Sequence, residues 1–305
     1  MTSSISVVLP TYRIGGLDVS FSGLGNQTFK DYEVILVDAL YGRRRQVVVE
    51  YAQEKGVPLI HIPPKKDTLP LHAPNNFENT GILQSSGELI IILGDYQYAP
   101  NNWLQRHWDA YMQDKQTIFT SGLDIYDHPP IKEGINEVLN PSAYYAFLDF
   151  NYCPEINDKV MITVFKEEFK PEMLRNLPLL IPDARGSVPQ HPHWSWVILK
   201  NDSIPIKALE AVNGLDESLD FGSGYQDTDF AFRVLKAEYK LFFDPSNKVF
   251  QVNHRSIIPP LKRLWNSNEN EAKVQQKIKL IEEGKESYFA PNDFNLREER
   301  RKLHG

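Results

Sequence analysis

Polar residues with binding chemistry follow three apolar runs in the first third of the chain. They are Pro10-Thr11-Tyr12-Arg13, Asp38 and Gly94-Asp95-Tyr96-Gln97. One carboxylate could hold a base or ribose and another a metal ion, while Arg13 and the cluster Arg43-Arg44-Arg45 could bind phosphate oxygens. This combination indicates a site for a nucleoside diphosphate. Each aspartate taken alone also fits a turn or a helix cap, and that interpretation stays open.

A sheet built mainly from parallel strands would position these residues, because apolar runs alternate with amphipathic stretches through the first 120 residues. Ligands bind beyond the carboxyl ends of the strands in such sheets, so Asp38 and Asp95 should converge on one edge. The run Leu89 to Leu93 is apolar throughout, which is typical of a central strand covered on both faces. The expected strands are 4–9 (ended by Pro10), 33–37, 59–62, 89–93 and 117–120, and the expected helices are 43–55, 77–86 and one that follows Pro100.

The rest of the chain divides into three parts. Periodicity is weak from Asp124 to about Pro192, where repeated prolines interrupt the pattern, and a long irregular insertion is usually functional or mobile. Regular structure returns over 194–199, with helices expected over 206–212 and 227–238 and a strand over 248–252. After Pro259 and Pro260 the composition shifts to Lys, Glu, Gln and Asn, which favours a peripheral helical extension over 256–305.

Composition excludes several classes of protein. The 305 residues include 33 Lys plus Arg and 40 Asp plus Glu, a formal charge of -7 that disfavours electrostatic nucleic-acid binding without excluding a local basic patch. Cys153 is the one cysteine, so no disulfide forms within the chain. With no long apolar run and no secretory signal, we expect a cytoplasmic protein without an integral membrane segment; peripheral membrane attachment stays open. Gly23-Leu24-Gly25 is too short for a dinucleotide fingerprint, and no Gly-Lys-Ser/Thr loop occurs.

Ordered motifs resemble those of a known family. The first block, residues 4–121, contains Val7 to Tyr12, Val37-Asp38, Asn79-Thr80-Gly81-Ile82 and Ser86-Gly87-Glu88 before the run Leu89 to Leu93; the second, about 194–255, contains Asn213 to Glu217, Gly224 to Phe230 and Val252-Asn253-His254. Together they resemble the family 2 nucleotide-sugar glycosyltransferases of GT-A fold. The resemblance implies an α/β fold of GT-A type with a Rossmann-like, mostly parallel central sheet, helices on both faces and a C-terminal helical extension. The implied domain spans 1–255, with a nucleotide-sugar-binding half (1–121), a variable insertion (122–193) and an acceptor and catalytic half (194–255), followed by the charged extension 256–305.

The resemblance also implies roles for individual residues. Asp227 would be the general base of an inverting transfer from a nucleotide-diphosphate donor, with UDP expected, to a glycan or other hydroxyl-bearing acceptor. Asp95 and His254 would hold Mn²⁺ or Mg²⁺ on the diphosphate. Counted from Asn79, however, the acidic metal motif falls on Gly94-Asp95-Tyr96 and retains one carboxylate. The nucleotide-sugar site would consist of Pro10, Thr11, Tyr12, Arg13, Asp38, Asn79 and Asp95.

Several residues have structural alternatives. Asp227 could be an N-terminal helix cap, and His254 a strand histidine satisfied by the backbone. Asp229 could position the acceptor or Arg233. Trp194 and Trp196 would share one face of a strand and could stack on an acceptor sugar, although core packing is the more frequent role of such residues.

Two other functions remain open on the sequence. The incomplete acidic motif, together with Gln226 where many relatives have Glu, would fit a degenerate relative that binds nucleotide or glycan without turnover. A nucleotidyltransferase would also use a parallel sheet and a nucleotide site. Those enzymes carry a glycine-rich basic loop after the first strand, and Pro10-Thr11-Tyr12-Arg13 supplies only the arginine.

Overall fold

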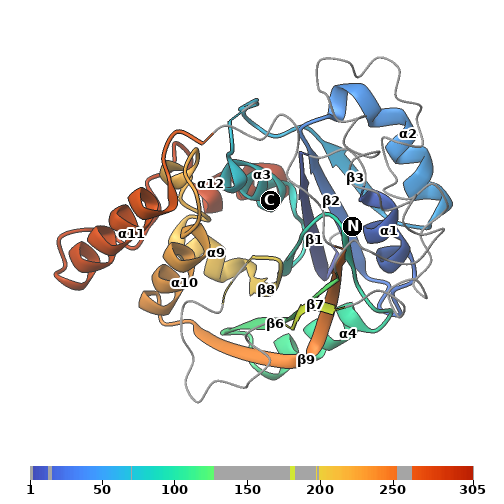
Figure 1. Cartoon of the computed structure of the whole chain (residues 1–305). Helices are drawn as coiled ribbons and strands as arrows, with labels where there is room; N and C mark the ends of the chain where they lie inside the picture. Colours follow the sequence, from blue (N-terminus) through green and yellow to red (C-terminus); the bar gives the residue numbers. More distant parts are fainter. Residues whose placement is uncertain are drawn as a thin grey trace.

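The computed structural model describes residues 3–12, 16–69, 71–126, 179–182, 197, 199–252 and 263–304. Within these residues one sheet has the order β3-β2-β1-β4-β8-β6-β9-β5, with β7 paired to β6 (Figure 1). The strands are β1 (Ile5–Thr11), β2 (Tyr32–Asp38), β3 (Leu59–Ile62), β4 (Leu89–Leu93), β5 (Gln97–Tyr98), β6 (Thr117–Tyr126), β7 (Leu179–Pro182), β8 (Asn201–Pro205) and β9 (Lys240–Val252). The helices are α1 (Leu17–Gly25), α2 (Tyr41–Glu54), α3 (Pro74–Gln84), α4 (Trp103–Gln113), α9 (Ile206–Val212), the short 3-10 turn η4 (Glu217–Leu219), α10 (Gln226–Lys236), α11 (Ser267–Glu282) and α12 (Leu296–His304).

The sheet carries an apolar core on each face. Strand β1 pairs in parallel with β2 and β4, and β2 pairs in parallel with β3. Alternate residues of a strand point to opposite faces, so Ile91 packs in the cluster that includes α1, α2 and α4, and Ile92 in the one that includes α3, α9, α10 and α12. This double coverage is the reason that β4 lacks alternation, and it confirms the predicted α/β fold with helices on both faces.

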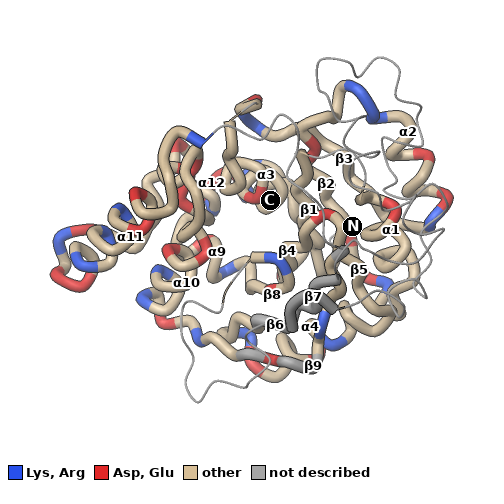
Figure 2. The backbone as a smooth tube through the Cα atoms, in the orientation of Figure 1, with Lys and Arg blue, Asp and Glu red and all other residues tan. Residues whose placement is uncertain are grey.

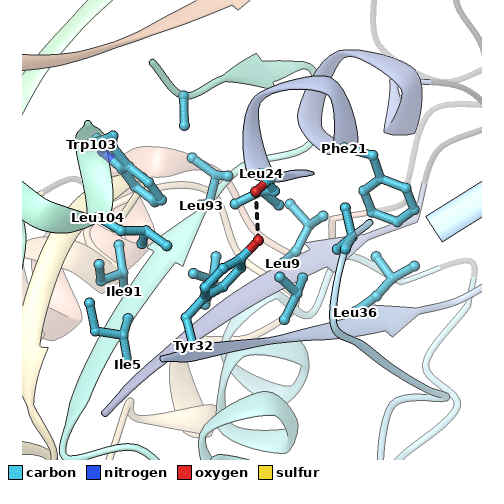
Figure 3. Packing of buried hydrophobic residues seen from close by; sticks show 14 of the residues in the cluster. Ile5, Leu9, Phe21, Leu24, Tyr32, Leu36, Ile91, Leu93, Trp103 and Leu104 are labelled. Carbon is cyan, nitrogen blue, oxygen red and sulfur yellow. Dashed lines mark hydrogen bonds between the residues drawn. The ribbon is translucent and has the colours of Figure 1, made fainter. Parts of the chain in front are cut away.

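The first of these clusters also contains one polar link. Figure 3 shows side chains of α1 and α4, among them Leu24 and Trp103, packed against residues of the parallel strands. The hydroxyl of Tyr32 donates a hydrogen bond to the backbone carbonyl of Leu24 at 2.6 Å. Burial raises the pKa of Tyr32 to about 12, so the hydroxyl keeps its proton and remains a donor.

Two features of the parallel half differ from the sequence prediction. Strand β1 continues through Pro10, which pairs with Val37 of β2. The pairing of β1 with β4 runs only from Ile5 to Val8, so the proline lies where one of the two ladders has ended. Helix α1 was not expected. Its Gly23 packs on the backbone of Ala99, where a β-carbon would lie 2.6 Å away, and glycines inside a helix weaken its sequence signal.

The second half of the sheet is mixed rather than parallel. Strand β8 pairs antiparallel with both β4 and β6, while β6 pairs in parallel with β9. The sequence prediction missed β8 because its first three residues, Asn201 to Ser203, are polar. Asn201 Oδ1 accepts from Trp103 Nε1 at 2.7 Å, and the Ser203 hydroxyl lies 3.0 Å from His107 Nδ1. Burial lowers the pKa of His107 to about 4, so the imidazole is neutral in this contact.

The C-terminal helices contribute unequally to the fold. In Figure 1, α11 extends away from the sheet, and in Figure 2 it carries both acidic and basic residues along its length. Helix α12 is not peripheral, because Leu296 is fully buried and the Arg300 guanidinium donates to the carbonyl of Ile82 at 2.7 Å at the end of α3. The described part of the predicted extension is therefore helical, and its second helix, α12, packs into the core. Within the described residues, no helix combines the length and apolar composition needed to cross a bilayer.

Candidate active site

A cavity of about 370 Å³ lies beyond the carboxyl ends of β1 and β4. It brings together Pro10, Tyr12, Asp95 and Asp227, four of the residues predicted from the sequence. The edge of the sheet predicted to bind ligands is therefore hollow. The lining residues are Pro10, Tyr12, His72, Pro74, Asn75, Phe77, Glu78, Gly94, Asp95, Leu199, Lys200, Gly224, Gln226, Asp227, Gln251 and Arg263.

Asp95 is held at this edge by a hydrogen bond from Thr11 and by the turn from Gly94 to Gln97. The hydroxyl of Thr11, at the end of β1, donates to Asp95 Oδ2 at 2.9 Å, so Thr11 supports the carboxylate from behind and does not itself line the cavity. Tyr96 adopts a left-handed backbone with φ of 62°, and its ring lies where a β-carbon on Gly16 would have to be. Gln97 Oε1 accepts the Gly94 N–H at 2.6 Å, which closes the turn. The turn is therefore fixed by packing and hydrogen bonds at each residue.

Asp227 lies in the first turn of α10 and lines the same cavity, although α10 is far from β1 and β4 in the sequence. The loop before it turns sharply, since Gly224 and Tyr225 have φ of 75° and 67°. Asp227 Oδ1 accepts the Thr228 N–H at 2.8 Å, so it also caps part of the helix start. Burial nevertheless outweighs this bond and raises the pKa of the Asp227 carboxyl above its usual value.

Two further buried carboxyl groups, Glu78 and its neighbour Asp220, lie in this region, and the sequence prediction included neither. Asp220 accepts the backbone N–H groups of Asn75 and Asn76 at 2.9 and 3.0 Å and so caps α3, but burial raises its pKa to about 8. Glu78 lines the cavity from α3; burial, together with the negative charges of Asp220 and Asp227, raises its pKa well above the usual range. No motif marks Glu78. Glu78 is recognised only in the structure, where α3 buries several polar residues.

Asp38 is placed differently from its predicted role. Its two oxygens accept hydrogen bonds from Leu40 N, from Arg44 Nε and Nη2, and from His61 Nε2, all at 2.7 to 2.9 Å. A carboxylate has about four acceptor positions, so all of them are used. The side chain is fully buried and is not among the residues that line the cavity. A direct contact between Asp38 and a nucleotide base would require one of these partners to move first.

Two other predicted residues hold the framework together instead of lining the cavity. Asn79 Nδ2 donates to the Leu215 carbonyl and its Oδ1 accepts the Leu215 N–H, both at 2.9 Å, so it fastens α3 to the segment after α9. Asp229 is paired with Arg233 and with Lys277 of α11, each at 2.7 Å. Of the two roles expected for Asp229, positioning the acceptor or positioning Arg233, these buried contacts match the second.

The C-terminal segment braces the loop that leads to Asp227. The indole of Trp265 packs against Gly222, leaving no room for a β-carbon there. Asn270 Nδ2 donates to the Gly224 carbonyl at 2.6 Å, and Leu264 N donates to the Phe221 carbonyl at 2.6 Å. The loop before Asp227 is therefore held by packing and hydrogen bonds although it contains Gly222 and Gly224. Arg263, from the same segment, lines the cavity and brings a cation that the sequence prediction did not include.

Four predicted residues lie outside the described part of the chain: Arg13, Trp194, Trp196 and His254. Among the residues that the structure does describe, no group of three or more His, Cys, Asp or Glu is arranged to hold a metal ion. Among the described residues Asp95 offers one carboxylate to a cation, and oxygen atoms of a substrate can supply further ligands.

Comparison with solved structures identifies the fold. No protein-family model matches the sequence, and no curated protein matches it. The structure of residues 1–349 of S. aureus TarS matches with a TM-score of 0.53 and 14% identity, covering 98% of this chain and 69% of that one. TarS in complex with UDP matches with a TM-score of 0.53, 12% identity and coverage of 98% and 69%, and TarS with UDP-GlcNAc with 0.54, 12% and coverage of 98% and 70%. Together with the sheet order and the cavity at its edge, these matches show that the chain has the GT-A fold.

Proposed function

We propose that this chain is a glycosyltransferase that moves a sugar from a UDP-sugar to a hydroxyl group of an acceptor. The observation that carries the proposal is that Asp95, after β4, and Asp227, at the start of α10, line one cavity. The presence of UDP and of UDP-GlcNAc in structures of TarS supports UDP as the nucleotide.

The proposed reaction is a single displacement with inversion. The acceptor oxygen attacks the anomeric carbon, the bond from that carbon to the diphosphate oxygen breaks, and the diphosphate leaves with its electron pair. Asp227 takes the proton of the acceptor hydroxyl. Its raised pKa makes this carboxylate a stronger base than an exposed aspartate would be, provided that it is ionised when the acceptor binds.

Charge on the leaving diphosphate also has to be balanced. A divalent cation, when bound, would supply that positive charge. Asp95 is the described residue placed to hold it, and a single carboxylate fits such a cation when diphosphate oxygens complete its coordination. Lys200 and Arg263 line the same cavity and can bind phosphate oxygens directly.

Replacing Asp227 with Asn tests the proposed base. The amide keeps the shape of the side chain but cannot accept the proton, so transfer should fall by roughly 10²- to 10⁴-fold while UDP binding changes little. UDP release with donor and acceptor present measures transfer, and calorimetry measures UDP binding. Asp109→Asn, an exposed residue on α4 outside the cavity, is the matched control. Full transfer by the Asp227→Asn protein would exclude Asp227 as the base.

The alternative is a protein that binds a nucleotide sugar without turnover. It is favoured by the single carboxylate at Asp95 and by Gln226 next to Asp227. Calorimetry of UDP with and without Mn²⁺, followed by an assay for hydrolysis of the donor, separates the two functions. Binding without hydrolysis or transfer by the wild-type chain supports the alternative.

A further inference from the structure

Three residues around the cavity carry buried polar atoms that lack a hydrogen-bond partner within the described residues. The atoms are Asn75 Oδ1, Glu78 Oε2 and Gln226 Nε2. The first two residues lie on α3 and the third on α10, and all three line the cavity that Asp227 lines. An unpaired buried polar atom is unfavourable, because it has lost its hydrogen bonds to water and gained none in return. Three of them around one cavity indicate a surface that is built to bond to a ligand.

The three groups offer complementary chemistry. Asn75 Nδ2 donates to the Asp216 carbonyl at 2.8 Å. A carbonyl can only accept, so this bond fixes the orientation of the amide and leaves Oδ1 as an acceptor. Gln226 Nε2 is a donor. The side chains are firmly placed, since Asn75, Glu78 and Gln226 are 1%, 8% and 9% exposed.

Glu78 can both donate and accept. Burial and the neighbouring carboxylates of Asp220 and Asp227 raise its pKa well above the usual range, and Lys200 opposes this only in part. These surroundings favour the protonated, neutral form of the Glu78 carboxyl over the carboxylate. A carboxylic acid donates one hydrogen bond and accepts others, which matches the hydrogen-bonding capacity of a hydroxyl group.

We propose that Asn75, Glu78 and Gln226 form a subsite for the hydroxyl groups of a carbohydrate ring. The proposal rests on the proposed function, because glycosyl transfer is what brings such a ring into this cavity next to Asp227. The ring can belong to the donor sugar or to the acceptor, since both present hydroxyl groups.

Glu78→Ala and Glu78→Gln test the subsite, with the exposed Glu286→Ala as control. Calorimetry compares UDP with a panel of UDP-hexoses and UDP-N-acetylhexosamines, and a glycan array tests acceptors. Glu78→Ala should bind UDP as the wild type does but bind the sugar-bearing ligand roughly tenfold more weakly, which corresponds to one lost hydrogen bond. Glu78→Gln keeps a donor and an acceptor and should retain sugar affinity. A loss confined to UDP-sugars assigns the subsite to the donor, and a loss confined to the array assigns it to the acceptor.

Two results would overturn the subsite. One is unchanged sugar affinity in Glu78→Ala; the other is a loss in Glu78→Gln as large as in Glu78→Ala, which would mean that an ionised carboxylate is needed. If Glu78→Ala does not fold, Gln226→Ala takes its place, because Nε2 has no described bond to lose. If the wild type binds no UDP, the proposed function fails, and the array then decides the subsite alone: binding that Glu78→Ala weakens supports it, and no binding overturns it.

Discussion

Buried carboxylates occur in two regions of this molecule, and their surroundings are opposite. At the end of β2, Asp38 is surrounded by donors: burial raises its pKa, but Arg44 and His61 outweigh burial and bring it down to about 2. At and near the cavity, burial raises the pKa of Glu78, Asp220 and Asp227, and within the described residues no arginine forms an ion pair with them. Figure 2 shows basic residues at the start of α2, the helix that carries Arg44.

The difference teaches what each region can do. A carboxylate with every acceptor position filled is a structural group, because a ligand has nothing left to bond to. Burial raises the pKa of a carboxyl group, which makes its ionised form a stronger base and its protonated form easier to populate, so such groups are suited to proton transfer and to contact with hydroxyl groups. The pKa shifts thus distinguish the stabilising pair of Asp38 and Arg44 from Glu78 and Asp227, the carboxyl groups that line the cavity.

The largest expected effect is the loss of the arginine that surrounds Asp38. Arg44→Met leaves a buried carboxylate whose remaining partners are His61 and the Leu40 N–H, and breaking a buried pair costs about 3–5 kcal/mol. Urea denaturation measures the change in the free energy of unfolding. Arg45→Met, at an exposed position on the same helix, is the control and should cost under about 1 kcal/mol. An equal decrease in the free energy of unfolding in the two variants would show that the pair of Asp38 and Arg44 does not stabilise the fold.

A second effect should appear as a change in pH dependence at the cavity. The folded pKa of Asp220 is about 8, above the unfolded value of 3.8. The folded state therefore binds the extra proton, and this contribution to stability decreases as pH rises from about 4 to about 8. Between pH 5 and 7 the wild type should lose about 2–3 kcal/mol relative to Asp220→Asn.

Denaturation series at several pH values measure this difference. Asp220→Asn also gives up one of two helix-capping bonds, a loss that is present at every pH and so shifts the curve without tilting it. Parallel curves for the two proteins would mean that Asp220 is ionised in the folded state, as Asp38 is.

The smallest effect has the opposite sign and belongs to Asp38. Its folded pKa of about 2 lies below the unfolded 3.8, so its contribution is present above pH 4 and is lost as pH falls toward 2. Between pH 5 and 3 the wild type should lose about 1 kcal/mol relative to Asp38→Asn. The same denaturation series, extended to acid, measures it. A wild-type curve that does not fall relative to Asp38→Asn in acid would show that Arg44 and His61 do not depress this pKa.

Sequence patterns were most informative where a strand is buried on both faces. The apolar run at β4 predicted a central strand, and the polar residues after β1 and β4 predicted the edge at which the cavity lies, because strand ends in a parallel sheet share one edge. The pattern failed at β8, where Asn201 and Ser203 form contacts with Trp103 and His107 of α4. A polar strand does not differ from a loop until its partners are known.

Contacts between distant segments decided the rest of the site. Nothing adjacent to Asp38 in the sequence shows that Arg44 and His61 fill its acceptor positions, and nothing near Asp227 shows that Trp265 and Asn270 brace its loop. Glu78 carries no motif; its importance arises from α3 meeting α10 at the cavity.

The sequence by itself determined the strands of the parallel half and the location of a binding edge, although it missed helix α1, because hydrophobic periodicity and strand polarity are local properties. Which carboxylates are neutralised by partners and which keep their protons was decided only by the tertiary structure. The physical reason is that a pKa depends on burial and on charges within a few ångströms, and those neighbours come from segments far apart in the chain.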